Sequence, residues 1–122
     1  HDAVRPCVAP AWIDAVFAQA RQCGAAMLAY PVHGTLKRVN KENYIESTSP
    51  RDGLWEAQTP QVFRKDWLLE AYAGEVAHVT DDAQLLEAIG KPVAVVMGDP
   101  RNIKITTPAD LQLAEAVIDT LP

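Results

Sequence analysis

The chain has 122 residues, enough for one domain, of which 48% are hydrophobic and 22% are charged, an ordinary composition for a globular protein. Eleven Lys and Arg against sixteen Asp and Glu give a formal net charge of −5. This charge argues against broad binding to nucleic acid or to anionic membrane surfaces, because both are polyanions. An anionic ligand must therefore meet a local cluster of cations. No apolar run approaches the roughly 20 residues that a membrane-spanning helix needs.

The first part of the chain predicts a helix and then a buried strand. Apolar residues recur at helical spacing from Pro10, which suits a first turn, and Gly24 suits a left-handed helix end. Residues 25–32 are almost all apolar and predict the strand. Residues 33–53 are polar and charged, and they predict either a solvated loop or a hairpin arm that projects from the domain. The two cysteines, Cys7 and Cys23, have no metal-type spacing, which favours reduced, structural thiols in an intracellular protein.

The middle of the chain predicts a strand and two helices. Residues 54–63 predict a strand and a turn, and the short helix that follows is expected to end at Gly74. Thr80 is the predicted N-cap of the next helix, because a hydroxyl accepts well at this position and the two aspartates after it favour the positive end of the helix dipole. That helix is expected to stop at Gly90.

The last part predicts two strands and a final helix. The continuous apolar run over residues 92–97 is typical of a strand covered on both faces, and residues 102–106 predict one more short strand. Thr107 as N-cap, Pro108 in the first turn and Asp110 completing a capping box predict the last helix. Its buried stripe is expected to consist of Leu111, Leu113, Ala114, Val117 and Ile118. Because strands alternate with helices, the predicted class is α/β with a mainly parallel sheet.

Candidate polar side chains fall in the loops where an open α/β sheet binds ligands. Each has an ordinary explanation when taken alone, as a surface charge, a helix cap or the exposed face of a strand. Four segments taken together are more specific. They are His-Asp-Ala-Val-Arg-Pro from His1, Gln-Thr-Pro-Gln from Gln58, Thr-Asp-Asp from Thr80, and Asn-Ile-Lys-Ile-Thr-Thr-Pro from Asn102.

In this order and spacing, the four segments resemble the 2-C-methyl-D-erythritol 4-phosphate cytidylyltransferase family. The resemblance covers essentially the whole chain but only the second half of a family member. It implies a Rossmann-like nucleotidyltransferase fold, a three-layer sandwich with a mainly parallel sheet and a projecting β-arm, whose N-terminal strands are missing from this chain. Residues 1–122 are then the C-terminal part of a single domain, with residues 33–53 as its dimerisation arm.

The resemblance implies catalytic roles for Asp2, Arg51 and Lys104. Asp2 matches an aspartate where nucleotide and substrate meet, and its neighbour Ala3 lies beside the ribose. Lys104 matches a lysine that orients the attacking phosphate. Arg51 matches an arm residue that reaches into the partner's active site in a homodimer and positions the substrate phosphate.

The resemblance also implies that Arg5, Thr35 and Thr80 bind the substrate, with Thr35 reaching it from the partner's arm. The ligands are CTP and methylerythritol phosphate, with Mg²⁺ bound through the CTP phosphates. A phosphate oxygen attacks the α-phosphorus of CTP and pyrophosphate leaves, so the protein has to neutralise charge and position the reactants. No general base is needed, because a phosphate is already ionised at neutral pH. No nucleic acid or membrane takes part, and the expected compartment is the bacterial cytoplasm, or the plastid stroma in a plant or alga.

Two departures from the family pattern stand out. The family usually has Asp before the arm arginine, where this chain has Pro50, which is expected to alter how Arg51 is presented. The family's Gly-rich nucleotide loop and its base-recognition segment lie outside this sequence. The chain should therefore hold mainly the substrate half of the site, and the isolated chain is expected to be inactive.

Two other interpretations stay open at this point. The ribitol-5-phosphate cytidylyltransferase family shares the His-Asp-Ala-Val-Arg-Pro and Gln-Thr-Pro-Gln segments, but Leu54-Trp55 and the doubled aspartate after Thr80 favour the methylerythritol enzyme. The other interpretation is a non-catalytic dimerisation remnant. The joint presence of Asp2, Arg5, Arg51, Thr80 and Lys104 argues against it.

Overall fold

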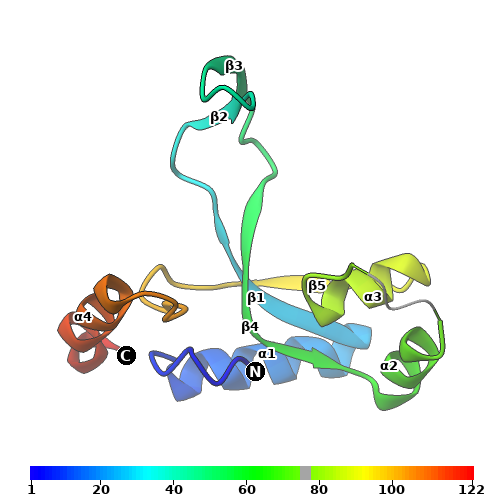
Figure 1. The fold of residues 1–122 in the computed structure, drawn as a ribbon. Coiled ribbons are helices and arrows are strands. Elements are labelled where there is room, and N and C mark those ends of the chain that lie inside the picture. Colours follow the sequence, from blue (N-terminus) through cyan, green and yellow to red (C-terminus); the bar gives the residue numbers. More distant parts are fainter. Residues whose placement is uncertain (75–77) are drawn as a thin grey trace.

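The computed structural model describes residues 1–74 and 78–122 and contains both helices and strands (Figure 1). In chain order the elements are α1 (Pro10–Cys23), β1 (Ala25–Pro31), β2 (Leu36–Val39), β3 (Ile45–Ser49), β4 (Trp55–Phe63), α2 (Lys65–Tyr72), α3 (Asp82–Ala88), β5 (Ala94–Met97), α4 (Pro108–Val117) and a short 3₁₀ helix, η1 (Ile118–Thr120). No helix in the described residues is both long enough and apolar enough to cross a membrane.

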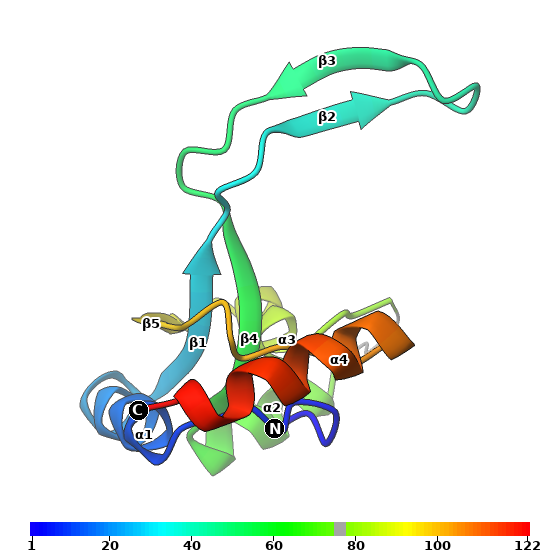
Figure 2. The same cartoon turned by 90° about the vertical axis from the view of Figure 1, so that its left-hand side faces the viewer.

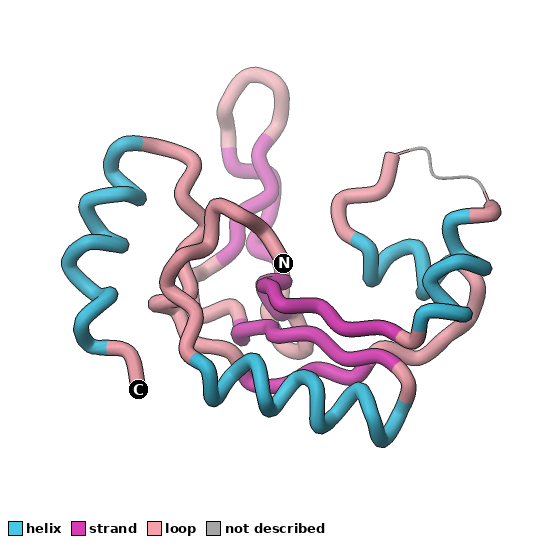
Figure 3. The backbone as a smooth tube through the Cα atoms, turned by 90° about the horizontal axis from the view of Figure 1, so that it is seen from below, coloured by secondary structure: helices cyan, strands magenta, loops and turns pink. Residues whose placement is uncertain are grey.

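The main sheet has three strands in the order β4-β1-β5. β1 pairs with β5 in parallel, with Ala26 opposite Ala94, and pairs with β4 antiparallel, with Ala25 opposite Phe63. The α/β class predicted from the sequence is therefore confirmed, and the sheet in this part of the chain is mixed. Figure 3 shows α1 lying along one face of the three strands.

Helix α1 covers the sheet with a small apolar cluster. Val16 and Ala20 of α1 pack against Ala26 and Leu28 of β1, and Val16 and Leu28 are fully buried. Burying a side chain of this size stabilises the fold by about 1.5–3 kcal/mol. A second cluster joins Ala25 to α2 and α3 through buried Ala71, Leu85 and Leu86. The two clusters therefore anchor the first part of β1 and the last residues of β4, Val62 and Phe63.

The predicted ends of α1 are confirmed. Pro10 occupies the first turn, and Gly24 follows the last residue with φ 95°, in the left-handed region. The Gly24 N–H donates to the Ala20 carbonyl at 2.7 Å, which closes the helix, and the Gly24 carbonyl accepts from the Arg64 N–H at 2.8 Å. The turn therefore ties the end of α1 to the segment that follows β4.

The polar stretch 33–53 contains a hairpin. β2 and β3 form an antiparallel two-stranded sheet of their own, and Lys37 Nζ donates to the Thr48 hydroxyl across it at 2.6 Å. The Asn40 carboxamide accepts the N–H groups of Glu42 and Tyr44, which shapes the turn. Figures 1 and 2 show the hairpin standing away from the main sheet, beyond the ends of β1 and β4.

The strand predicted over residues 92–97 forms as β5, but the expectation that both faces are covered is wrong. Ala94 and Val96 pack against the α1 cluster. Val95 and Met97 point to the opposite face and are 50% and 59% exposed. A continuous apolar run cannot by itself distinguish a strand covered twice from an edge strand covered once, and β5 lies at the end of the strand order.

Two further expectations about the C-terminal part are wrong. Residues 102–106 form no strand, and the segment is anchored by single contacts such as the Ile105 N–H donating to the Val4 carbonyl at 2.8 Å. The predicted stripe of α4 is also largely uncovered, because Ala114 is buried while Leu111, Leu113 and Ile118 are 45–56% exposed. The buried Ala114 joins the helix to the N-terminal segment, since its carbonyl accepts from the Cys7 thiol at 3.7 Å.

The start of α4 agrees with its prediction and implies a dependence of stability on pH. Asp110 Oδ2 accepts from the N–H groups of Thr106 and Thr107 at 3.0 and 2.8 Å and from the Thr106 hydroxyl, and the Thr107 hydroxyl accepts from the Asp110 N–H. These hydrogen bonds, the Thr106 N–H first, lower the pKa of Asp110 from 3.8 to about 2.

Because the pKa of Asp110 is lowered by folding, its contribution to stability is present above the unfolded value of 3.8 and is lost as the pH falls through about 2. Asp110→Asn should therefore flatten the fall of the unfolding free energy between pH 3.8 and about 2, measured by urea denaturation over that range. Asp14→Asn removes a carboxylate from the exposed side of α1 and is the matched control. An unchanged acid profile in the Asp110 variant would contradict the prediction.

Candidate functional site

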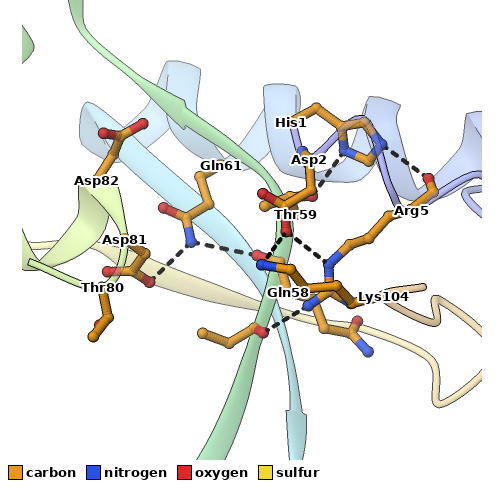
Figure 4. Close-up of a pocket in the computed structure, with 11 residues that line it drawn as sticks. His1, Asp2, Arg5, Gln58, Thr59, Gln61, Thr80, Asp81, Asp82 and Lys104 are labelled. Atoms are coloured by element: carbon orange, nitrogen blue, oxygen red, sulfur yellow. Dashed lines mark hydrogen bonds and ion pairs between the residues drawn. The ribbon is translucent and has the colours of Figure 1, made fainter. Parts of the chain in front are cut away.

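A polar pocket with a volume of about 370 Å³ lies where four distant segments meet (Figure 4). The N-terminal segment, β4, the turn before α3 and the loop before α4 contribute its lining residues, which are His1, Asp2, Arg5, Ala57, Gln58, Thr59, Gln61, Thr80, Asp81, Asp82 and Lys104. Four of the residues singled out from the sequence, Asp2, Arg5, Thr80 and Lys104, are thus brought together.

Asp2 carries the central carboxylate of the pocket. Its Oδ2 lies 3.3 Å from Arg5 Nε and 3.3 Å from Lys104 Nζ. Partial burial raises the pKa of Asp2, but the hydrogen bonds and charges of Lys104 and Arg5 outweigh this effect, so the pKa lies below its ordinary value. Asp2 is therefore ionised at neutral pH, and the Lys104 side chain, 51% exposed, reaches it from the solvent side.

Arg5 is the best-anchored cation of the pocket. Its side chain is only 11% exposed, and its guanidinium donates to Asp2 Oδ2, to the Asn102 carbonyl at 2.6 Å and to the Ala57 carbonyl at 3.3 Å. Three of its five N–H groups are therefore used within the chain. Arg5 ties the N-terminal segment to β4 and to the loop before α4, and its charge is fixed next to Asp2.

The Gln-Thr-Pro-Gln segment of β4 forms one wall of the pocket. The Thr59 hydroxyl accepts from the Asp2 N–H at 3.1 Å and contacts His1 Nδ1 at 2.9 Å. Gln61 Nε2 donates to Asp81 Oδ2 at 3.0 Å, and Gln61 Oε1 accepts from the Ala83 N–H at 3.2 Å. β4 thereby holds the N-terminal segment on one side and the start of α3 on the other.

Thr80 lies in the pocket wall but does not cap α3, so that prediction is wrong. The cap is Asp81, whose carboxylate accepts from the Gln84 N–H at 3.0 Å. The Thr80 N–H and hydroxyl instead donate to Gln84 Oε1 at 2.9 and 3.2 Å. The Asp81 carboxylate also accepts from Gln61 Nε2, a contact between distant segments that the local sequence does not reveal.

The remaining predicted residues lie elsewhere. Ala3 is exposed in the N-terminal segment and does not line the pocket. Thr35 and Arg51 lie at the base of the hairpin, just before β2 and just after β3, and both are exposed. The Arg51 guanidinium donates to the His33 carbonyl. The single chain therefore does not place these two side chains among the residues that line the pocket.

A second hollow adjoins the first. It has a volume of about 420 Å³, shares Arg5, Ala57, Gln58 and Lys104 with the first pocket, and extends past His33 toward the base of the hairpin. Arg51 is bonded to the carbonyl of that same His33. The hairpin base therefore lies next to the pocket, although neither Thr35 nor Arg51 lines either hollow.

Sequence reasoning gave no role to several residues that shape the pocket. The sequence pattern assigns no individual role to Gln58, Thr59 and Gln61, which belong to the Gln-Thr-Pro-Gln segment, or to His1 and Asp81. Asn102, 1% exposed, was also missed. The usable signal is the amide side chains of Gln58, Gln61 and Asn102 within these segments, because a buried amide has to be hydrogen-bonded to its neighbours.

The comparisons with known proteins agree with one another. A family model described as IspD, 2-C-methyl-D-erythritol 4-phosphate cytidylyltransferase, matches residues 1–120. The protein of that name from Dechloromonas aromatica is 48% identical over 119 residues, which are 97% of this chain and 52% of the relative. The one from Syntrophotalea carbinolica is 48% identical over 123 residues, with 98% and 52% covered. The chain spans about half the length of the curated relatives it matches.

Solved structures show the same likeness. The crystal structure of 2-C-methyl-D-erythritol 4-phosphate cytidylyltransferase from Thermus thermophilus matches with a TM-score of 0.87 and 40% identity, covering 98% of this chain and 60% of that one. The enzyme from Francisella tularensis matches with a TM-score of 0.85 and 41% identity, covering 95% and 56%. The Rossmann-like nucleotidyltransferase fold expected from the sequence is confirmed by these neighbours.

Proposed function

Because this chain belongs to the 2-C-methyl-D-erythritol 4-phosphate cytidylyltransferase family, we propose that it supplies mainly the substrate half of a cytidylyltransferase site. The reaction transfers a cytidylyl group from CTP to 2-C-methyl-D-erythritol 4-phosphate. The products are 4-diphosphocytidyl-2-C-methyl-D-erythritol, a precursor in the non-mevalonate route to isoprenoids, and pyrophosphate. The observation that carries the proposal is the convergence of Asp2, Arg5, Thr80 and Lys104 on one pocket.

The chemistry of the pocket suits the joining of two anions. An oxygen of the substrate phosphate attacks the α-phosphorus of CTP, the bond to the β-phosphate oxygen breaks, and pyrophosphate leaves with the electron pair. Lys104 reaches the pocket from the solvent side and provides the point charge that orients the attacking phosphate. Asp2 accepts hydrogen bonds from hydroxyl groups of substrate and ribose, beside Ala3.

Thr80 and Arg5 complete the substrate side. The Thr80 side chain lines the pocket from the turn before α3, and its hydroxyl donates to or accepts from the substrate. The Arg5 guanidinium is already bound by three acceptors of its own chain, so it contributes its fixed charge and the placement of Asp2 rather than a new bidentate grip.

The proposed metal is Mg²⁺, held by the phosphates of CTP. Within residues 1–74 and 78–122, no group of three His, Cys, Asp or Glu side chains could hold a metal ion. Asp2 is also already paired with Arg5 and Lys104. These residues do not fit a metal site of their own, so Mg²⁺ enters this proposal only as a companion of the nucleotide.

The hairpin is proposed as a dimerisation arm. Its exposed tip carries Tyr44 and Ile45, 72% and 65% exposed, which is costly surface for a segment that contacts only water. Thr35 and Arg51 at its base are exposed and lie outside the pocket lining of their own chain. In a homodimer they serve the partner's pocket, with Arg51 on the substrate phosphate.

The direct test is turnover by the complete protein that contains this chain. With Mg-CTP it should release pyrophosphate on addition of methylerythritol phosphate and much less with ribitol 5-phosphate. The isolated 122-residue chain should transfer nothing and bind Mg-CTP only weakly in a calorimetric titration. Micromolar CTP binding or any transfer by the isolated chain would contradict the division of the site proposed here, and preference for ribitol 5-phosphate would favour the alternative substrate.

Mixing two inactive variants tests the arm. Arg51→Ala removes the group that acts on the partner, and Asp2→Ala removes a group of the home pocket. A heterodimer of the two should contain one intact site, so mixing after subunit exchange should restore up to about half of the parent's activity per heterodimer. The matched control is Arg38→Ala, another exposed hairpin arginine, which should keep its activity without any mixing. Failure of the Arg51 mixture to regain activity would argue that the arm acts on its own chain or not at all.

The two other interpretations are weaker. The relatives reported above carry the methylerythritol name, so they give no support to ribitol phosphate as the substrate. A non-catalytic remnant would have no need for an ionised Asp2 held between two cations. The relatives are bacterial, which supports the bacterial cytoplasm over a plastid as the proposed compartment.

A further inference from the structure

Asn102 is a buried amide in the loop before α4, next to the pocket. It is 1% exposed and is one of the largest fully buried side chains in the described residues, where the others are Leu28, Leu86, Val16 and Cys7. Burial of an amide among such residues costs free energy unless hydrogen bonds replace those to water. The contacts of Asn102 therefore indicate what its burial achieves.

These contacts join Asn102 to both supports of Asp2. Its Nδ2 donates to the Thr59 carbonyl at 2.9 Å and lies 3.4 Å from Gln58 Oε1. Its own carbonyl accepts from the Arg5 guanidinium at 2.6 Å. The Thr59 hydroxyl holds the backbone of Asp2, and Arg5 holds its carboxylate.

The side-chain orientation of Asn102 is set by these partners. The opposite amide orientation would place Oδ1 against the Thr59 carbonyl, where two acceptors repel each other. In the observed orientation Oδ1 is buried and has no hydrogen-bond partner among the described residues. The bond from Nδ2 to β4 thus requires this one orientation of the amide.

Lys104 depends on this bond more than a residue in a sheet would. It lies two residues after Asn102 in a segment that forms no strand, so no ladder of hydrogen bonds fixes its backbone. Besides Asn102, the Ile105 N–H bond to the Val4 carbonyl anchors the segment near Lys104. Both anchors lead to the N-terminal segment or to β4, which carry the pocket.

We propose that Asn102 is a positioning residue for the transfer reaction, which fixes Lys104 and Arg5 around Asp2 by anchoring the loop before α4 to β4. The inference rests on the proposed function, because it assigns Asn102 to the same site. It predicts that Asn102 acts on the reaction through Lys104. A residue that only stabilises the fold would lower activity to the same degree whether or not Lys104 is present.

A double-mutant cycle in the complete protein separates these two roles. Asn102→Ala should lower kcat by on the order of 10- to 100-fold in the parent, and by less than about threefold in the Lys104→Ala background. Val16→Ala removes a fully buried side chain of the α1 cluster, outside the pocket lining, and is the stability control, with kcat close to that of the parent. If Asn102→Ala does not fold, Asn102→Ser, which keeps a small polar side chain, enters the same cycle.

A second measurement does not require activity. The carboxyl carbon of Asp2 is followed by NMR across a pH titration of the complete protein. The pKa of Asp2 should rise toward its ordinary value in the Asn102 variant, because Arg5 and Lys104 are no longer held beside it, and should stay as in the parent in Val16→Ala.

The outcomes distinguish the two proposals. A parent protein without cytidylyl transfer, but with the shift of Asp2 in the Asn102 variant, would reject the proposed function and support the placement role. An active parent in which the losses of Asn102 and Lys104 multiply independently would overturn the inference alone. So would an unchanged pKa of Asp2 in the Asn102 variant.

Discussion

Lys104→Ala is expected to lower kcat/KM for methylerythritol phosphate by about 30- to 1000-fold in the complete protein. The loss corresponds to roughly 2–4 kcal/mol of transition-state stabilisation, the range for a preorganised donor directed at developing charge. The structure gives the reason, because Nζ lies 3.3 Å from Asp2 Oδ2, the side chain is half exposed, and Lys104 lines the pocket. Steady-state rates of pyrophosphate release measure the effect.

Two further variants make this result specific. Lys104→Arg keeps the charge with a different shape and should recover part of the activity. Lys65→Ala removes an exposed lysine at the start of α2, outside the pocket lining, and should leave the rate unchanged. Activity of Lys104→Ala within twofold of the parent would reduce Lys104 to a surface lysine paired with an aspartate.

Gly24→Ala is expected to destabilise the fold strongly, because the added methyl group meets both a steric clash and an unfavourable backbone conformation. A Cβ at Gly24 would lie 2.4 Å from the nearest ring atom of Trp67, and φ is +95°. The left-handed backbone costs about 1–2 kcal/mol for a residue with a side chain. Forcing the ring aside costs about 1–3 kcal/mol more. Equilibrium unfolding in urea should show a total loss of roughly 2–5 kcal/mol.

Gly53→Ala is the matched control for this prediction. Gly53 also has a positive φ, +77°, but an added Cβ meets nothing within 4 Å. Its variant should lose only the backbone contribution, about 1–2 kcal/mol. Equal losses at the two positions would show that Trp67 moves away at no cost. In that case the contacts of Trp67 with Arg64 and Lys91, at 5.1 and 5.5 Å from its ring centre, would contribute little.

Local signals in the sequence predicted local structure well. The capping box of Thr107 and Asp110 and the left-handed end at Gly24 depend on neighbouring residues alone, and both are present. At the start of α3 the same reasoning predicted Thr80 as the cap, but the cap is Asp81. The Asp81 carboxylate also accepts a hydrogen bond from Gln61, which lies on a strand far away in the sequence.

Burial was harder to predict, because it depends on what lies on the other side of a segment. The apolar run at β5 and the apolar stripe of α4 have the sequence pattern of elements that are covered by others. In the structure, however, Val95, Met97, Leu111 and Leu113 are about half exposed. Three charged residues of the pocket, Asp2, Arg5 and Lys104, could be predicted from motifs. Asn102 could not, because an amide carries no charge and its importance comes from a contact with Thr59, far away in the sequence.

The shared carboxylate of Asp2 means that the charges of Arg5 and Lys104 are partly neutralised before a ligand arrives. The Lys104 ammonium has three N–H donors and its side chain is half exposed, so a phosphate can bind the remaining donors while Asp2 stays in place. The bound phosphate would then lie near the Asp2 carboxylate, and two anions at such a distance repel each other. A ligand that also presents a hydroxyl donor to Asp2 offsets part of this repulsion, whereas a simple inorganic anion does not. Under the proposed function, the same carboxylate that holds the two cations would therefore favour a phosphate and an alcohol on one molecule.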